Sequence, residues 1–97
     1  MNTKLLHIPA DIIETIVENA FEWLVVVDRE GRIIYINHNY CEFLEVNREE
    51  TIGRHVTEVI ENTRMHIVAQ TGKEELADLQ FIKGNYMIAN RVPIIKN

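Results

Sequence analysis

Residues 23–37, WLVVVDREGRIIYIN, decide the fold of this chain. Residues 23–27 are apolar, mostly β-branched or aromatic, and show no polar alternation, which predicts a central strand buried on both faces. Residues 28–31 are typical of a turn that ends on Gly31, since glycine takes a positive φ at little cost. Residues 32–36 then predict the antiparallel partner strand, so the stretch as a whole predicts a β-hairpin.

Asn37 ends this stretch and opens a predicted helix, because its side chain can accept a hydrogen bond from a backbone N–H of the first turn. Tyr40, Phe43 and Leu44 fall on one face of that helix. Further short helical pieces are expected after it, with their caps and stops at Asn47 and Glu50, which resemble a capping box, at Gly53, and at Thr57, which precedes Val59 and Ile60.

Two more helices are expected on either side of these pieces. Pro9 stands where a helix would begin, and residues 9–19 predict an amphipathic helix that buries one stripe against its own sheet or a partner's matching helix. Asn62 or Thr63 is expected to cap the second helix, and Gly72 to end it. The apolar face of that helix carries Met65, Val68 and Ala69.

A second hairpin is predicted for residues 76–83 and 86–95. These runs flank Gly84-Asn85, and glycine in the first loop position favours a type II′ turn. Pro93 lacks a donor N–H, so the far end of the second strand must be unpaired, bulged or at an edge. The expected total is four strands, with helices grouped between the first pair and the second.

Composition limits both the size and the partners of the protein. The chain has 97 residues and 46% hydrophobic content, enough for one domain with one modest core. Ten basic against fifteen acidic side chains give a net charge of -5, which disfavours direct binding of nucleic acid and of anionic lipid. The single cysteine, Cys41, cannot form an internal disulfide, and no apolar run approaches the roughly 20 residues of a membrane helix, so a cytoplasmic protein is expected.

The order of these elements over residues 17–97 resembles the PAS family of sensor domains. Asn37, Ile52-Gly53 and residues 91–94 stand where that family places comparable residues. More narrowly, residues 61–64, 71–73 and 90–94 look like the N-terminal PAS domain of bacterial sigma-54-dependent, enhancer-binding transcription activators. The resemblance implies an α+β fold, in which an antiparallel sheet carries helices on one face. It makes residues 1–97 a single PAS domain, with residues 1–20 as lead and amphipathic helix and residues 21–97 as core.

The resemblance also implies a function in sensing. Such a domain would bind a small polar or anionic molecule and signal by rearranging a homodimer, with ATPase and DNA-binding modules attached in the full-length protein. Two alternatives stay open: a ligand-free module for dimerisation or protein interaction, and the PAS domain of a sensor histidine kinase. A cavity on the order of a few hundred Å³ would favour the ligand-binding reading over a solid core.

The chain departs from the family pattern at its C-terminal end. A PAS sheet has five strands, and the fifth, which lies centrally beside the first, would follow residue 97. Its absence would leave a gap of one strand, about 4.8 Å from each neighbour, with unpaired backbone groups on both edges. We therefore expect either residues 1–6 or a neighbouring chain's strand to fill the gap, unless the natural protein continues past residue 97.

Polar candidates for a ligand site lie on the second long helix and the last strand. Arg64, near the amino end of the helix, suits an anion, and its alternative is a surface salt bridge to Glu61 or Glu58. His66 could hydrogen-bond a carboxylate or ligate haem, although a structural or solvent-facing role suits a lone histidine better. Of the alternating pair on the last strand, Asn90 is expected to face the pocket and Arg91 to face away.

Apolar candidates would line the cavity or simply fill the core, and they are Tyr40, Phe43, Val56, Ile60, Met65, Phe81 and Ile88. No cofactor is expected. His7, His38 and His55 are scattered and predict no zinc site, and Cys41 lies outside the pattern of the flavin-binding relatives. No nucleophile, base or phosphate-loop motif indicates an enzyme.

Overall fold

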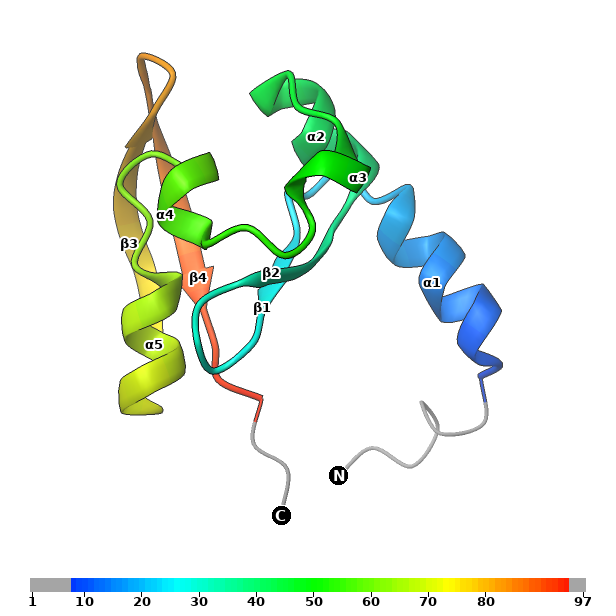
Figure 1. Cartoon of the computed structure of the whole chain (residues 1–97), viewed down its shortest axis with the longest axis horizontal. Coiled ribbons are helices and arrows are strands. Elements are labelled where there is room, and N and C mark those ends of the chain that lie inside the picture. Colours follow the sequence, from blue (N-terminus) through cyan, green and yellow to red (C-terminus); the bar gives the residue numbers. More distant parts are fainter. Residues whose placement is uncertain (1–7, 95–97) are drawn as a thin grey trace.

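The computed structural model describes residues 8–94, which form two β-hairpins with helices before and between them (Figure 1). The expected order of elements is confirmed, with four strands and the short helices grouped between the two strand pairs. In chain order the elements are α1 (Ala10–Glu18), β1 (Val25–Val27), β2 (Ile33–Ile36), α2 (His38–Leu44), α3 (Arg48–Thr51), α4 (Val56–Val59), α5 (Met65–Thr71), β3 (Glu75–Ile82) and β4 (Asn85–Arg91).

The first hairpin joins β1 to β2 through the predicted turn. Val25 stands opposite Ile36 in an antiparallel register. Asp28 Oδ1 accepts a hydrogen bond from the backbone N–H of Arg32 at 2.9 Å, and Gly31 has a φ of 80°. A side chain at Gly31 would also collide with its surroundings, because a Cβ there would lie 2.6 Å from His55 Nε2. Both the backbone conformation and the close approach therefore require glycine.

The predicted burial of the first strand on both faces is wrong. β1 covers only Val25–Val27, and all three residues are half-buried. The reason is that β1 pairs only with β2 in the part of the chain that the structure describes, so its other edge has no neighbouring strand. Apolar composition predicts a strand, but the number of its neighbours decides how deeply it is buried.

Asn37 joins the first hairpin to the helices on both sides of it. Its Oδ1 accepts from the backbone N–H of Tyr40 at 3.2 Å, which confirms the predicted cap of α2. The same Oδ1 accepts from the N–H of Leu24 at 3.1 Å, and Nδ2 donates to the carbonyl of Glu22 at 2.8 Å. Because Asn37 is completely buried, these bonds replace its hydration and fix the segment between α1 and β1.

The caps of the short helices follow the predictions in part. Asn47 caps α3 as expected, with Oδ1 accepting from the N–H of Glu50 at 3.3 Å. The predicted cap at Thr57 is wrong, because the cap lies two residues earlier, at His55, whose Nδ1 accepts from the N–H of Thr57 at 3.3 Å. The sequence does not indicate an imidazole as a cap, since Ser, Thr, Asp and Asn dominate at that position.

The last helix of the central group, α5, begins and ends close to the predicted positions. Arg64 occupies the cap position without a side-chain cap, while the hydroxyl of Thr63 accepts from the N–H of Met65 at 3.2 Å. Gly72 ends the helix with a φ of 70°, as predicted. The predicted cap at Asn62 or Thr63 is therefore wrong by at least one residue, although the Thr63 hydroxyl still accepts from the first N–H of the helix.

The second hairpin turns one residue earlier than predicted. Ile82 pairs with Asn85, so the loop consists of Lys83 and Gly84, whose φ angles are 50° and 81°. Positive φ at both loop positions defines a type I′ turn, so the predicted type II′ turn at Gly84-Asn85 is wrong. Asn85 supports the observed turn by donating from Nδ2 to the carbonyl of Lys83 at 3.2 Å. β4 ends before Pro93, as the missing donor of proline demands.

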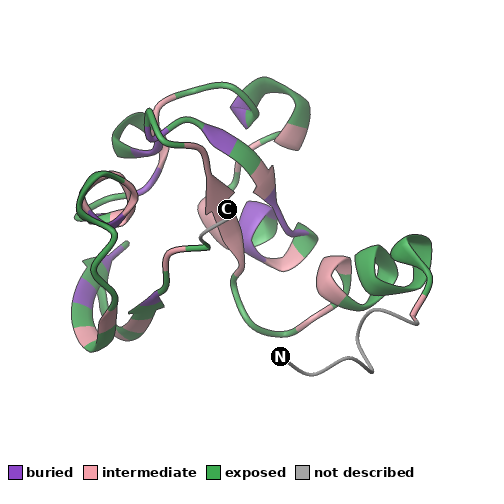
Figure 2. Ribbon diagram, turned by 90° about the horizontal axis from the view of Figure 1, so that it is seen from below, coloured by how far each residue is buried: buried purple, intermediate pink, exposed green. Residues whose placement is uncertain are grey.

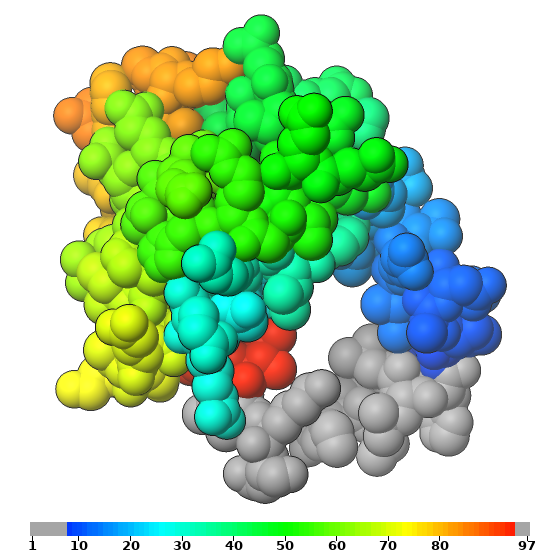
Figure 3. Space-filling model, in the orientation of Figure 1, coloured from blue at the N-terminus to red at the C-terminus, as the bar shows by residue number. Residues whose placement is uncertain are grey.

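The core lies between the first hairpin and the helices that follow it. Ile33, Ile36 and Val56 are completely buried, and Ile60, Ile82, Tyr40 and Cys41 complete the cluster. In Figure 3 the helical segment coloured green covers the front of the molecule. Helix α1 stands apart, and its apolar stripe stays exposed instead of packing on the sheet (Figure 2), with Ile16 61% exposed.

The two hairpins do not join into one sheet. Within residues 8–94 the sheet order is β1-β2 in one sheet and β3-β4 in the other. Both sheets are antiparallel, so the predicted α+β class is confirmed, but the four described strands form two separate two-stranded sheets and not one. Residues 1–6, one of the two expected fillers of the gap, lie outside the described residues.

A groove between the two hairpins

A groove with a volume of about 740 Å³ separates the two hairpins. Residues 21–25, which lead into and begin β1, border one side, and residues 87–91 of β4 border the other. Apolar side chains from the helices and from β3 contribute to its lining, among them Tyr40, Ile60 and Ile82. The groove therefore lies where the two sheets would meet if another strand joined them.

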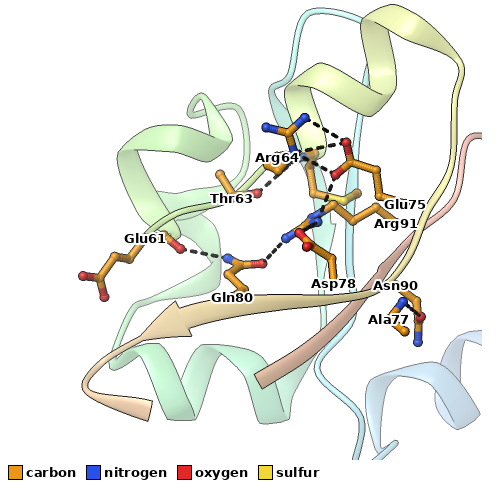
Figure 4. Close-up of polar contacts among 10 residues, drawn as sticks. Glu61, Thr63, Arg64, Glu75, Ala77, Asp78, Gln80, Asn90 and Arg91 are labelled. Atoms are coloured by element: carbon orange, nitrogen blue, oxygen red, sulfur yellow. Dashed lines mark hydrogen bonds and ion pairs between the residues drawn. The ribbon is translucent and has the colours of Figure 1, made fainter. Parts of the chain in front are cut away.

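Arg91 brings a buried positive charge to this groove. Its side chain is only 2% exposed, and Nη1 donates to Asp78 Oδ2 at 2.7 Å and to Glu75 Oε1 at 3.0 Å (Figure 4). Nη2 donates to Gln80 Oε1 at 2.7 Å, and Gln80 Nε2 in turn donates to the carbonyl of Glu61 at 2.8 Å. Strand β3 thus supplies three partners that hold the guanidinium in place.

The charges around Arg91 balance. Arg64 forms a bidentate contact with Glu75, with Nε 2.9 Å from Oε1 and Nη2 2.9 Å from Oε2. Hydrogen bonds from Arg64, and the charge of Arg91 beside it, lower the pKa of Glu75, and the hydrogen bond from Arg91 lowers the pKa of Asp78. Both carboxylates are therefore ionised at neutral pH, and two positive charges face two negative ones.

Arg91 keeps hydrogen-bonding capacity for a further molecule. A guanidinium carries five N–H groups. Among the described residues, the three bonds to Asp78, Glu75 and Gln80 are the ones that Arg91 makes through its side chain. Because Arg91 lines the groove, its remaining donors are the candidates for contact with a polar group there.

An aromatic wall closes the side of the groove next to β1. Trp23 stacks on Phe43 with ring centroids 4.0 Å apart, and on Tyr40 at 5.7 Å. Burial raises the pKa of Tyr40 to about 12, so its hydroxyl stays neutral at any physiological pH. Trp23 is the one tryptophan in the sequence, and its fluorescence therefore reports on the groove.

The groove brings together half of the site residues that the sequence predicted. Those that line it are Tyr40, Ile60, Met65, Ile88 and Asn90, and those outside its lining are Phe43, Val56, Arg64, His66 and Phe81. Phe43 and Val56 lie one layer behind the lining. Phe43 stacks on Trp23, and Val56 belongs to the core cluster that supplies some of the lining residues.

The last strand brings both residues of the alternating pair to the groove, so the prediction that Arg91 faces away from it is wrong. Arg91 is the buried residue of the pair, whereas Asn90 is exposed and accepts from the backbone N–H of Ala77 at 2.9 Å through Oδ1. Asn90 shares its face with Tyr86 and Ile88, as predicted, and that face is the more exposed one, with Ile88 63% exposed, although Ile88 and Asn90 still border the groove. Arg91 tolerates burial because three side chains of β3 satisfy it.

Arg64 and His66 lie away from the groove. Arg64 forms a salt bridge, as its alternative reading expected, although the partner is Glu75 and not Glu61 or Glu58. The ring of His66 packs edge-on against that of His55, with centroids 5.5 Å apart, and its Nδ1 is buried without a hydrogen-bond partner among the described residues. Over residues 8–94 no cluster of three His, Cys, Asp or Glu side chains is arranged to hold a metal ion.

The sequence reasoning missed Thr63, Gln80 and Trp23 as lining residues. The sequence indicates Thr63 only as a cap, and Trp23 and Gln80 only as strand residues. A usable signal was the pattern Glu75-x-x-Asp78-x-Gln80 on one strand of a hairpin, opposite an arginine on the other. Cross-strand pairing of opposite charges would have drawn Arg91 toward that face.

Comparisons with known proteins agree with this architecture. The model of the PAS fold matches residues 12–86. The chain is 31% identical over 83 residues to the sensor protein CitS of Halalkalibacterium halodurans, and the match covers 84% of this chain but 15% of that protein. The chain therefore corresponds to a small part of the relative's length.

Two solved structures share the fold. The complex of DhaR(N) with DhaL from E. coli contains a chain that matches with a TM-score of 0.67 and 14% identity, over 89% of this chain and 31% of that one. The PAS domain of an HTR-like protein from Haloarcula marismortui matches with a TM-score of 0.55 and 22% identity, over 79% of this chain and 64% of that one. In the described part of the present chain, no helix is long and apolar enough to cross a membrane.

Proposed function

The chain belongs to the PAS family, and from that premise we propose that it senses a small polar or anionic molecule, which binds in the groove between the two hairpins. The observation that carries this proposal is Arg91, a buried guanidinium that lines the groove and keeps N–H donors unused by the described residues. No enzymatic step is part of the proposal.

The surroundings of Arg91 favour a ligand that accepts hydrogen bonds. Glu75 and Asp78 already neutralise the two guanidinium groups, so the site has donors to offer without a large excess of positive charge. Aromatic and aliphatic side chains line the rest of the groove and suit the carbon skeleton of a small molecule. A small carboxylate or an amide of the same shape meets both requirements.

We propose that the signal leaves the domain through α1. Its exposed apolar stripe suits a matching helix of a second copy, and Glu18 at its end contacts both Tyr35, at 2.7 Å, and Arg48. The paired α1 helices of such a dimer would have two arrangements. A ligand in the groove would shift the dimer toward one of them if the two arrangements bind the ligand with unequal affinity. In the full-length protein this bias would act on an attached output module.

Two kinds of output module fit the comparisons. The likeness in fold to DhaR(N) favours ATPase and DNA-binding modules of an enhancer-binding activator, while the relation to a sensor protein favours a histidine kinase. We propose a cytoplasmic bacterial signalling protein in either case, and direct contact with nucleic acid is assigned to the output module and not to this acidic chain.

The test of the ligand site uses Trp23 fluorescence during titration with four probes: acetate, acetamide, succinate and succinamide. We expect at least one probe to give a saturable change in the wild type. Arg91→Lys should weaken that binding tenfold or more, because lysine cannot reproduce the planar set of donors. Arg64→Lys is the matched control, since it shares Glu75 but lies outside the lining, and it should change the affinity less than twofold.

A second candidate function, a ligand-free dimerisation module, is favoured by the exposed stripe of α1. The variant Ile16→Glu places a charge on that stripe and should abolish self-association measured by sedimentation. Dimerisation that depends on Ile16, together with no response to any of the four probes, would favour this second function over sensing.

A further inference from the structure

Strand β3 carries one residue too many opposite β4. The pairing of residues 78–82 with β4 is regular, but Glu75 pairs with Arg91 one position out of step with it. Two residues of β3, Leu76 and Ala77, therefore stand opposite a single residue of β4. Such a β-bulge changes which side chains of a strand share a face.

The bulge decides which side chain of β3 faces the guanidinium of Arg91. Glu75 and Asp78 are three positions apart, so a regular strand would point them to opposite faces. With the bulge both contact Arg91, at 3.0 Å and 2.7 Å. Leu76, which a regular strand would turn inward, is instead 57% exposed. The bulge thus places a carboxylate where a regular β3 would place an apolar side chain.

One side-chain hydrogen bond holds the bulge. Ala77 has a φ of 53°, a conformation that an L-residue with a Cβ disfavours. Its N–H donates to Asn90 Oδ1 at 2.9 Å (Figure 4), which is the hydrogen bond that Asn90 makes through its side chain among the described residues. The bulge therefore combines an unfavourable backbone angle with an exposed leucine, and Asn90 opposes both.

A regular register is available to the same residues. If the pairing of residues 78–82 continued by two steps, Ala77 would stand opposite Asn90 and Leu76 opposite Arg91. Ala77 would then take an extended φ, and Leu76 would turn to the inner face. Arg91 would keep its two other partners on β3, so only residues 75–77 need to move.

We propose that this bulge is a register switch and that Asn90 is its positioning residue. With the bulge, Glu75 faces the guanidinium of Arg91, and without the bulge Leu76 faces it. In the regular register Asp78 alone would balance the two guanidinium groups beside the groove, which leaves one positive charge in excess. The switch therefore determines how strongly this end of the groove attracts an anion.

A monocarboxylate would supply the charge that Glu75 withdraws. Its binding would therefore favour the regular register, because the two registers would bind the anion with unequal affinity. This coupling rests on the proposed function, whereas the register exchange itself requires no ligand. The two parts of the inference can therefore be tested separately.

Asn90→Ala removes the bond that holds the bulge and tests the switch without a ligand. In the wild type, NMR should show the strong N–H to Hα contact within Ala77 that accompanies a positive φ. In the variant this contact should weaken, and an Hα–Hα contact between positions 77 and 90 should appear, because the two become a non-hydrogen-bonded pair. The Nε–H signal of Arg64 should move as Glu75 leaves it. Asn85→Ala, the matched control on the same strand, should change none of these signals.

Two substitutions at Ala77 separate the switch from a general loss of stability. Ala77→Gly accepts a positive φ at little cost, so adding it to Asn90→Ala should return the Arg64 signal to its wild-type position. Ala77→Val keeps Asn90 but disfavours the positive φ, and should give the same register change as Asn90→Ala. A positive φ that persists at position 77 in both Asn90→Ala and Ala77→Val overturns the switch. Unfolding of both variants overturns it as well, because the regular register leaves the rest of the hairpin unchanged.

Acetate and acetamide test the coupling to a ligand, with Trp23 fluorescence as the readout. Acetate should bind Asn90→Ala about threefold more tightly than the wild type, while neutral acetamide should show no preference. Equal affinity of acetate for both proteins, with the register exchange observed, overturns the coupling. Acetate that binds neither protein overturns the coupling and contradicts the proposed ligand site, while the register exchange stands or falls on the NMR contacts alone.

Discussion

Arg91 donates a hydrogen bond to Gln80 at 2.7 Å across the second hairpin, and both side chains are more than nine-tenths buried. This contact fixes the one buried charge of the groove to the inner face of β3. It also explains why Gln80 is buried, since its own amide donates to the carbonyl of Glu61 and so has a partner on each side.

Replacing Arg91 should therefore cost far more stability than replacing Arg64. Arg91→Gln removes hydrogen bonds to charged groups and should lower the free energy of unfolding by about 1.5–3 kcal/mol. Arg64→Gln breaks a more exposed contact to the same Glu75 and should cost less than about 1 kcal/mol. Urea unfolding followed by Trp23 fluorescence measures both values, and equal losses would show that burial of Arg91 contributes nothing.

Asn37→Ala should be among the most destabilising changes in the first hairpin. The substitution removes the cap of α2 and leaves the carbonyl of Glu22 without its 2.8 Å partner. The expected loss is about 2–4 kcal/mol, from a cap and at least one buried group left unsatisfied. Asn47→Ala removes an exposed cap and should cost about 0.5–1 kcal/mol. A loss for Asn37 no larger than for Asn47 would contradict its linking role.

Gly31→Ala and Gly72→Ala separate backbone strain from crowding. Both glycines have positive φ, which costs an L-residue about 1 kcal/mol or somewhat more. A Cβ at Gly72 meets nothing within 4 Å, whereas one at Gly31 would lie 2.6 Å from His55 and 2.9 Å from His66. Gly31→Ala should therefore lower the melting temperature clearly more than Gly72→Ala, and similar shifts would show that the turn moves away from the histidines at no cost.

Alkaline pH should destabilise the protein through Tyr40. Burial raises its pKa from 10.0 in the unfolded chain to about 12 in the folded one. The folded state therefore holds this proton more tightly, so the stability that Tyr40 contributes is complete below pH 10 and is lost as the pH rises toward 12. The fall in melting temperature across this range should become smaller in Tyr40→Phe but should not vanish, because the pKa of Tyr35 is also raised to about 12, while Tyr86→Phe, at a position 74% exposed, should behave as the wild type. A wild-type slope in Tyr40→Phe would refute the assignment.

Local signals explain why the first hairpin could be predicted from the sequence. Asp28, Gly31 and Asn37 act on backbone groups within a few residues, and the structure shows Gly31 and Asn37 in their expected roles. The burial of β1 could not be predicted, because it depends on whether another strand lies on its far edge.

The orientation of β4 was likewise predictable only in part: local backbone geometry could be inferred from the sequence, and the packing against the neighbouring strand could not. Successive side chains of a strand point to opposite faces of the sheet, so the sequence correctly places Asn90 and Arg91 on different faces of β4. Which of the two faces is buried depends on the side chains of β3, three of which satisfy Arg91. More of the apolar candidates line the groove than of the pair Arg64 and His66. Apolar side chains gather in the interior whatever the function, whereas a single polar residue in a sequence does not indicate which way its side chain points.

The most direct measurement is a titration with succinate followed by NMR of the arginine Nε–H signals, with Arg91 and Arg64 assigned through their variants. We expect the Arg91 signal to shift in a saturable manner, because its guanidinium lines the groove, while the signal of Arg64 stays in place. Movement of the Arg64 signal alone, or equal and unsaturable movement of both, would contradict a ligand site between the two hairpins.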